Sequence, residues 1–470
     1  MSFAKIALRS TTGSRPITVA WCCEPRQMKH LCPSVGTPQV AVAIAGSQEE
    51  RIVRLVMIVL AVIVLSWSAA EAQNDAQFPY PDPYLATVTG TALNADGLTP
   101  GIKREVIAVP ILADRDRLPG LEGRGALNIA LYRQKKPAPL LFILPGTGSN
   151  PFFGIATYVA GLFHQQGSHV VLLPSPMTWN FALAASRSGA PGYTPDDARD
   201  LYDAMQRILA LLQDRHDIKI TRINLLGMSL GALEAAYVSR LDAQTNRIGI
   251  ARYLLVDPPL DVSSVLTKLE EWGALREKFG LAKTKELETR ALGVVEGARQ
   301  KQGDAAAVVA ELARGFAPLT REEIQFLIAA YMETALPELV TITQAIHDQG
   351  VLSAPKGQVR KRLQEARRMT FADYSDKIAG PIWSARSGEP DTKVTAFTER
   401  GSLGAILEQL KGNPRVFIVY NTDDFLADRQ AIEDLKTAMG TQVKLYPYGG
   451  HMGSLWFPPN RDYMLGLFQE

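Results

Sequence analysis

The sequence predicts an α/β protein, with a mostly parallel sheet flanked by helices and a helical cap inserted between two late strands. Short apolar runs typical of buried strands alternate with helix-forming segments along most of the chain. That alternation stops once, between residues 261 and 400, where the pattern is helical throughout. One predicted strand, residues 223–226, runs directly into a Gly-x-Ser-x-Gly turn that is followed by a helix.

The predicted strands are apolar runs that end in turn residues. Residues 140–144 form a continuous apolar run ended by Pro145-Gly146, which is typical of a strand buried on both faces. Residues 169–173 repeat this pattern and end at Pro174. The same criteria predict strands over residues 105–112, 127–133, 223–226, 253–256, 416–420 and 443–446.

Helices are predicted from capping residues and apolar stripes. Thr194 is expected to cap a helix that begins at Pro195, because two aspartates follow in its first turn. Thr320-x-x-Glu323 has the form of a capping box before an apolar run. Other helices are expected over residues 232–241 and from about residue 461, whereas the proline-rich residues 78–83 are expected to be extended.

These patterns divide the chain into four segments. Residues 1–72 are an N-terminal extension and signal peptide, and residues 73–260 are the first part of the sheet domain. Residues 261–400 are the helical cap insertion, which at about 140 residues is too long for a loop. Residues 401–470 complete the sheet domain.

The N-terminal extension contains a secretion signal pattern. Residues 55–67 are an apolar run, preceded by Arg51 and Arg54 and followed by Ala70-Glu71-Ala72. The run is shorter than the roughly 20 residues of a spanning helix. We therefore expect an exported protein, periplasmic or secreted, or one anchored to the membrane if the run is not removed. We expect translation from Val53, with residues 1–52 an upstream extension.

Composition excludes several classes of protein. The 470 residues are 46% hydrophobic and 21% charged, which is ordinary for a globular protein, and the net charge of +2 gives no field that would draw nucleic acid. All three cysteines, Cys22, Cys23 and Cys32, lie in the extension. The rest of the chain therefore has no disulfide framework, cysteine nucleophile or zinc–thiolate site.

A basic group lies within the predicted cap. It is either a solvated helix face or a docking patch for an anionic lipid surface or a polyanionic substrate. Its members are Lys356, Arg360, Lys361, Arg362, Arg367 and Arg368.

A serine nucleophile is predicted in the turn Gly227-Met228-Ser229-Leu230-Gly231. Strand, turn and helix here form the setting of a nucleophile elbow, whose sharp, strained turn needs very small flanking residues, here Gly227 and Gly231. The turn lifts the hydroxyl of Ser229 to a helix N-terminus, where amides and the helix dipole favour a developing anion. The alternative is a plain strand–helix turn with a capping serine.

A serine hydroxyl needs a base, and His451 is the best candidate among six histidines. It follows the strand 443–446 in a glycine-rich loop, past the C-terminal edge of the sheet, where open α/β sheets bind ligands. The other five lie in the extension, beside helices, at a strand start or in the cap: His30, His164, His169, His216 and His347.

The base needs an acid to orient it, and three aspartates follow strands. Asp423 and Asp424 are adjacent after residues 416–420, so one of them could be a turn residue. Asp257 ends the strand 253–256 and is more simply explained as a turn and cap residue.

An oxyanion site is expected from the glycine-rich loop after the strand 140–144. The backbone N–H groups of Leu230 and Thr147 are the expected donors. The loop lacks the Lys-Ser/Thr ending of a phosphate-binding loop.

These motifs resemble the α/β-hydrolase superfamily over roughly residues 105–260 and 400–470. The matches are the Leu144-Pro145-Gly146-Thr147 loop, the Gly227–Gly231 elbow, Asn421-x-x-Asp424 and Gly450-His451. The family commonly has glycine three residues before its acid, so the resemblance selects Asp424, and it also has the chain order Ser…Asp…His. The family places its cap after the strand that here ends near Asp257. It often has His-Gly in place of Pro145-Gly146, a departure that keeps the backbone amides.

The sequence thus predicts an exported serine hydrolase that cleaves carboxylic esters through an acyl-enzyme. Its expected partner is a small-molecule or lipid-like ester, with no metal, organic cofactor or nucleic acid. An amidase or peptidase, or an acyltransferase in which an alcohol replaces water, would use the same triad. A non-catalytic binding protein of the same fold is the alternative from another class.

Overall fold

The computed structural model describes residues 77–95, 98–99, 102–112, 114–115, 118, 121–299, 304–387 and 394–469, which lie in one compact unit, Asn74–Glu470. The predicted signal segment lies outside the described residues, and so do the three cysteines.

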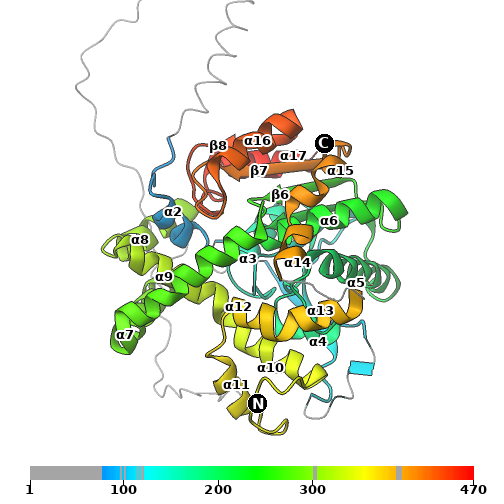
Figure 1. Cartoon of the computed structure of the whole chain (residues 1–470). Helices are drawn as coiled ribbons and strands as arrows, with labels where there is room; N and C mark the ends of the chain where they lie inside the picture. The colour runs from blue at the N-terminus through cyan, green and yellow to red at the C-terminus, as the bar shows by residue number, and fades with distance from the viewer. Residues whose placement is uncertain are drawn as a thin grey trace, which may run out of the picture. The chain divides into compact units, whose positions relative to one another are not determined.

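A sheet of eight strands forms the centre of the protein (Figure 1). Its strand order is β1-β2-β4-β3-β5-β6-β7-β8, and all pairs from β4 onward are parallel, whereas β2 runs antiparallel to β1 and β4. The predicted α/β-hydrolase fold is therefore confirmed. The strands are β1 Arg104–Pro110, β2 Ala126–Tyr132, β3 Ala138–Leu144, β4 His169–Leu172, β5 Ile220–Met228, β6 Arg252–Val256, β7 Val416–Asn421 and β8 Val443–Tyr446.

Alternating side chains of the strands are buried on the two faces of the sheet. In β3, Leu141 and Ile143 face one apolar cluster, while Leu140 and Phe142 face the other. The first cluster is covered by α3 Ile155–Gln165 and α17 Pro458–Leu467, and it continues into the cap. The second is covered by α5 Thr194–Asp214, α6 Leu230–Thr245 and α16 Arg429–Met439. Burial on both faces explains why β3 is a continuous apolar run.

Between β6 and β7 the described chain is helical, as the sequence predicted (Figure 1). The predicted capping box forms at the start of α9, where Thr320 and Glu323 exchange side chain–backbone hydrogen bonds. The helices of this segment are α7 Val262–Arg299, α8 Ala305–Phe316, α9 Arg321–Met332, α10 Leu336–His347, α11 Val359–Ala366, α12 Phe371–Tyr374, α13 Gly380–Ser387, α14 Val394–Gly401 and α15 Leu407–Lys411.

One stretch of the described chain, Arg321–His347, is long and apolar enough to cross a membrane, with a mean hydropathy of 1.3. Within it, the 3₁₀ helix Glu333–Ala335 connects α9 to α10. Leu327, Leu339 and Val340 from this stretch are buried in the apolar cluster of the cap. Its apolar composition is therefore that of a helical core.

Two local predictions need correction. Thr194 is the first helical residue of α5, and Tyr193 holds the capping position without a side-chain bond. The Asp197 carboxylate instead accepts the N–H of Gly192. Pro83 starts a helix, α2 Pro83–Gly90, in which Asp82 caps the N–H of Leu85, although the proline-rich segment was predicted to be extended. Aspartate followed by proline is itself a helix-start signal, which the sequence analysis did not use.

The basic group of the cap is only partly a solvated face. Arg362 is buried and donates to the carbonyl oxygens of Ala354 and Gln344, so it stabilises the loop between α10 and α11. Lys356 pairs with Asp348. A docking patch for an anionic lipid surface would therefore have fewer than six free cationic side chains, because Arg362 is buried and Lys356 is paired.

A buried carboxyl on α6 gives the first testable prediction. Glu234 is buried, and neither of its side-chain oxygens has a hydrogen-bond partner among the described residues. Burial, with the charge of nearby Asp197, raises the pKa of Glu234 well above its usual range. The folded state therefore keeps a proton that the unfolded chain loses above about pH 4.3, and stability falls as the pH rises from there.

We expect Glu234→Leu to raise the free energy of unfolding by about 1–3 kcal/mol, because it removes an unpaired buried polar group. The gain should be larger at pH 8 than at pH 5. Glu234→Gln, which keeps the polar atoms, should flatten the pH dependence with a smaller gain. Thermal unfolding of the three proteins at both pH values measures this. A loss of stability in Glu234→Leu would contradict the prediction.

Candidate active site

Ser229 lies in a strained turn between β5 and α6. Its φ of 54° and ψ of −123° are unusual for a residue with a side chain. A Cβ on Gly227 would lie 2.2 Å from the carbonyl oxygen of Gly231, and a Cβ on Gly231 would lie 2.3 Å from that of Leu144. Backbone alone fits at both positions, so the two glycines allow the turn that holds Ser229 between the end of β5 and the start of α6.

The three residues predicted as a triad lie in one hydrogen-bonded chain. Nε2 of His451 is 2.8 Å from Oγ of Ser229, and Nδ1 of His451 is 2.8 Å from Oδ2 of Asp424. All three side chains are buried. A ring with its proton on Nδ1 donates to Asp424 and leaves Nε2 free to accept the serine proton. The ring is therefore placed to act as a general base.

Asp423 and Asp424, which the residues alone did not separate, have different positions. Asp424 contacts the imidazole, and its other oxygen accepts the N–H of Leu426. Asp423 accepts the N–H groups of Gly449 and Gly450, so it stabilises the loop that carries His451. The spacing from Asn421, used with the resemblance, selected the residue that contacts the ring.

The loop that carries His451 also packs against α2, the helix that the sequence analysis missed. Oγ1 of Thr87 accepts the backbone N–H of His451 at 2.8 Å. Gly450 has a φ of 55°, and a Cβ there would lie 2.1 Å from the carbonyl oxygen of Pro83. Helix α2 thus helps to position the loop that carries the imidazole. No sequence motif marks Thr87 as part of the site.

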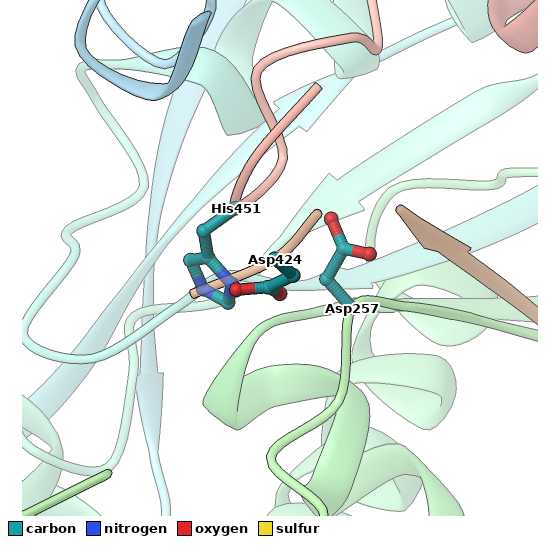
Figure 2. Close-up of side chains that lie close together, drawn as sticks. All are labelled: Asp257, Asp424 and His451. Atoms are coloured by element: carbon teal, nitrogen blue, oxygen red, sulfur yellow. The ribbon is translucent and has the colours of Figure 1, made fainter. Parts of the chain in front are cut away.

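Asp257, at the end of β6, lies beside the imidazole–carboxylate pair (Figure 2). Its carboxyl accepts the N–H groups of Asn421 and Met452, which tie the ends of β6 and β7 to the loop of His451. Burial and the charge of Asp424 raise the pKa of Asp257 to about 8. The residue therefore does more than turn the chain, but it does not hydrogen-bond the ring.

One ligand atom from each of Asp257, Asp424 and His451 lies within 4.8 Å of the others, a spacing that could hold a metal ion. The same groups are already engaged, because Nδ1 of His451 bonds Asp424 and the oxygens of Asp257 face backbone N–H donors. An ion there would have to displace these donors. The donor set therefore fits a hydrogen-bonded triad better than a metal centre.

The residues predicted to bind an oxyanion border the same cavity as Ser229. Leu230 is the first residue of α6, so its N–H has no acceptor within the helix. Thr147, in the loop after β3, lines that cavity beside Leu230. Gly146, the residue before Thr147, lies against Ser229, because a Cβ on it would approach Cβ of Ser229 to 3.2 Å. The N–H of Leu230, at a helix N-terminus, and the backbone of Thr147 thus border the cavity beside Ser229, a setting that favours a developing negative charge.

The pH dependence of the site can be predicted from its charges. Burial favours the neutral ring, but Asp424 and, to a lesser extent, Asp257 more than offset this, so the pKa of His451 is raised above its usual value. A base must be neutral, so kcat/KM should rise as the pH increases through this pKa. Asp257, with its pKa of about 8, is charged only in the upper part of this pH range, where its charge favours the imidazolium. Asp257→Asn removes that charge, so the midpoint of the rise should move to lower pH, chiefly through the part of the curve near pH 8.

A profile of kcat/KM between about pH 5 and pH 9 measures this midpoint. Asp423→Asn is the matched control, because Asp423 is a neighbouring carboxylate that bonds the loop and not the ring. An unchanged or higher midpoint in Asp257→Asn would contradict the electrostatic role of Asp257.

No family model and no curated protein matches this chain. Several solved structures do. An esterase from Pyrococcus furiosus is 10% identical, covers 78% of this chain and 90% of its own, and gives a TM-score of 0.35. An α/β hydrolase from a Penicillium species is 13% identical, with 78% and 98% covered and a TM-score of 0.39. A membrane phospholipase A is 13% identical, with 88% and 98% covered and a TM-score of 0.36.

Proposed function

We propose that this chain, which has the fold of an α/β hydrolase, is a serine hydrolase that cleaves carboxylic esters. One observation carries the proposal: Ser229, His451 and Asp424 form a continuous, buried hydrogen-bonded chain at a strained elbow. Such strain is retained where the surrounding structure holds it in place, and it clusters at sites of chemistry.

The reaction follows from the positions of the atoms. Oγ of Ser229 attacks the ester carbonyl carbon while Nε2 of His451 takes its proton, and the backbone N–H groups of Leu230 and Thr147 bind the oxyanion. The tetrahedral intermediate collapses, the C–O bond to the alcohol breaks, and His451 gives its proton to the leaving oxygen. Water then attacks the acyl-enzyme by the same steps. Each bond made or broken in this reaction involves only the ester, water, the side chains of Ser229 and His451, and the backbone N–H groups.

Esters are favoured over amides as substrates by the walls around Ser229. One cavity at Ser229 is lined by Leu230, Leu266 and Trp383 among others, and its described lining residues include no Lys, Arg, Asp or Glu. A peptide backbone there would bury its N–H and C=O groups with few partners, whereas an ester has no N–H to satisfy.

The test is a parallel assay of p-nitrophenyl esters and matched p-nitroanilides, together with intact-mass labelling by a fluorophosphonate. We expect one adduct on the folded protein and ester turnover at least about 100-fold faster than anilide turnover. Faster anilide turnover would assign an amidase. A product that carries an added alcohol would assign an acyltransferase. No adduct on folded protein would favour a non-catalytic role.

We also propose that the protein is exported. The support is the pattern of residues 51–72, with two arginines, an apolar run and a small-x-small site. N-terminal sequencing of the protein from the exported fraction should find a start just after Ala72. A start before Arg51 would overturn the signal-peptide interpretation, and full-length protein in the membrane fraction would favour the anchor.

A further inference from the structure

Two cavities meet at Ser229. The first, called here the narrow cavity, has a volume of about 780 Å³, and the second, the wide cavity, has about 1610 Å³, where both volumes include space open to solvent. They share only Thr147, Ser229 and Met332 among the described residues that line them. The nucleophile thus lies at a junction, with a separate space on each side for the two halves of a substrate.

Helix α7 forms a wall of both cavities. Val262, Val265, Leu266 and Leu269, spaced to share one face of the helix, line the narrow cavity. Ala291, Leu292, Val295 and Arg299, one face of its second half, line the wide cavity. Gly280 separates the halves with a φ of 71° and a ψ of 166°, a conformation almost confined to glycine. Figure 1 shows α7 running along the cap in front of the sheet.

The position of His451 decides which half of an ester lies in which cavity. The leaving alcohol takes its proton from Nε2 of His451, so the alcohol must lie on the side of the imidazole. His451 and its neighbour Met452 line the wide cavity but not the narrow one. The alcohol half therefore lies in the wide cavity and the acyl half in the narrow cavity.

Both cavities are apolar. The narrow cavity is lined mainly by aliphatic and aromatic side chains, among them Leu266, Phe371 and Trp383. The wide cavity has exposed apolar side chains at its mouth, where Phe153, Leu292 and Tyr331 are 57%, 72% and 63% exposed. Exposed apolar groups of this size usually mark a binding surface. A small polar alcohol would leave these walls unfilled.

We infer that the substrate is an ester with two large apolar halves, in which a hydrocarbon acyl chain fills the narrow cavity and a bulky apolar alcohol fills the wide cavity. This inference rests on the proposed ester hydrolase function and names its substrate class. Burial of each added methylene favours binding, so both halves add to the recognition of the ester.

Two substrate series test the two halves separately. One series keeps p-nitrophenol and lengthens the acyl chain from acetate to octanoate, and the other keeps octanoate and enlarges the alcohol from methanol to decanol. For the wild-type protein we expect kcat/KM to rise at least about 10-fold along each series. A fall along either series would overturn the inference for that half of the ester.

Three tryptophan substitutions on α7 assign the cavities. Leu266→Trp narrows the narrow cavity and should reduce the octanoate-to-acetate preference about 10-fold. Val295→Trp narrows the wide cavity and should reduce the decyl-to-methyl preference by a similar factor. Leu281→Trp is the matched control, because Leu281 is 86% exposed and lines neither cavity. It should leave both preferences unchanged.

The opposite pattern, in which Leu266→Trp affects the alcohol series and Val295→Trp the acyl series, would reverse the assignment. Unchanged preferences in both variants would overturn it. If Leu266→Trp does not fold, Leu266→Ala should move the best acyl chain to a greater length. Fluorophosphonate labelling separates the two levels of failure. Labelled protein with flat series would overturn the substrate class alone, whereas a folded wild type without label would overturn the proposed function.

Discussion

Ser229→Ala is expected to abolish fluorophosphonate labelling and to reduce ester kcat by about 10⁵-fold or more, which is the usual consequence of removing the nucleophile of a serine triad. No described side chain other than Ser229 offers a hydroxyl to Nε2 of His451. The backbone geometry of the elbow does not depend on the hydroxyl, so the variant should remain folded. Intact mass with and without the fluorophosphonate measures the first effect, and initial rates with a p-nitrophenyl ester measure the second.

Ser239→Ala is the matched control for this result. Ser239 lies on α6, the helix that begins just after Ser229, and is buried, but its hydroxyl donates to the carbonyl oxygen of Ala236. It should keep full labelling. Ser229→Gly adds a second comparison, because glycine tolerates the positive φ of the elbow and should be inactive yet about 1 kcal/mol more stable. An adduct that persists in Ser229→Ala would show that another residue is the nucleophile.

The fold could be predicted where local chemistry and tertiary structure agree. β3 is buried on both faces, so its apolar run carries its own signal, and β8 matches residues 443–446 without change. β5 extends from Ile220 to Met228, well beyond the four residues predicted, because strand pairing continues past both ends of the apolar run. Ile220 pairs with Ala138 of β3, and Met228 pairs with Val256 of β6. The ends of a strand depend on the neighbouring strands with which it pairs, and the local sequence does not say which strands those are.

The residues of the site also differ in whether the local sequence marks them. Ser229 and His451 carry local signals, an elbow and a glycine-rich loop, and the structure brings both together with Asp424. Thr87 carries none, and Asp257 carries only that of a carboxylate at a strand end, because their contacts with the loop of His451 join segments up to 364 residues apart in the chain. The two cavities also escaped prediction, since they form between α7 and elements that the sequence does not place side by side.

Asp424→Asn is expected to lower kcat by about 10⁴-fold, the size of effect known when the acid of a serine triad becomes an amide. An asparagine amide in place of Oδ2 would donate to Nδ1 of His451, and the ring would then carry its proton on Nε2. That proton faces Oγ of Ser229, so the ring could no longer accept the serine proton. Fold and cavities should be unaffected, and the loss should appear in kcat with little change in KM.

Asp423→Asn separates orientation of the ring from stability of its loop. Its carboxylate receives two backbone N–H groups, so the amide should cost about 1.5–3 kcal/mol of stability, as expected for hydrogen bonds to a charged group. Its effect on kcat should stay within about 100-fold, because it does not contact the imidazole. Asp424→Asn should show the reverse, with kcat lost and the melting temperature nearly kept. If Asp423→Asn or Asp257→Asn lost more kcat than Asp424→Asn, the acid would have to be reassigned to that carboxylate.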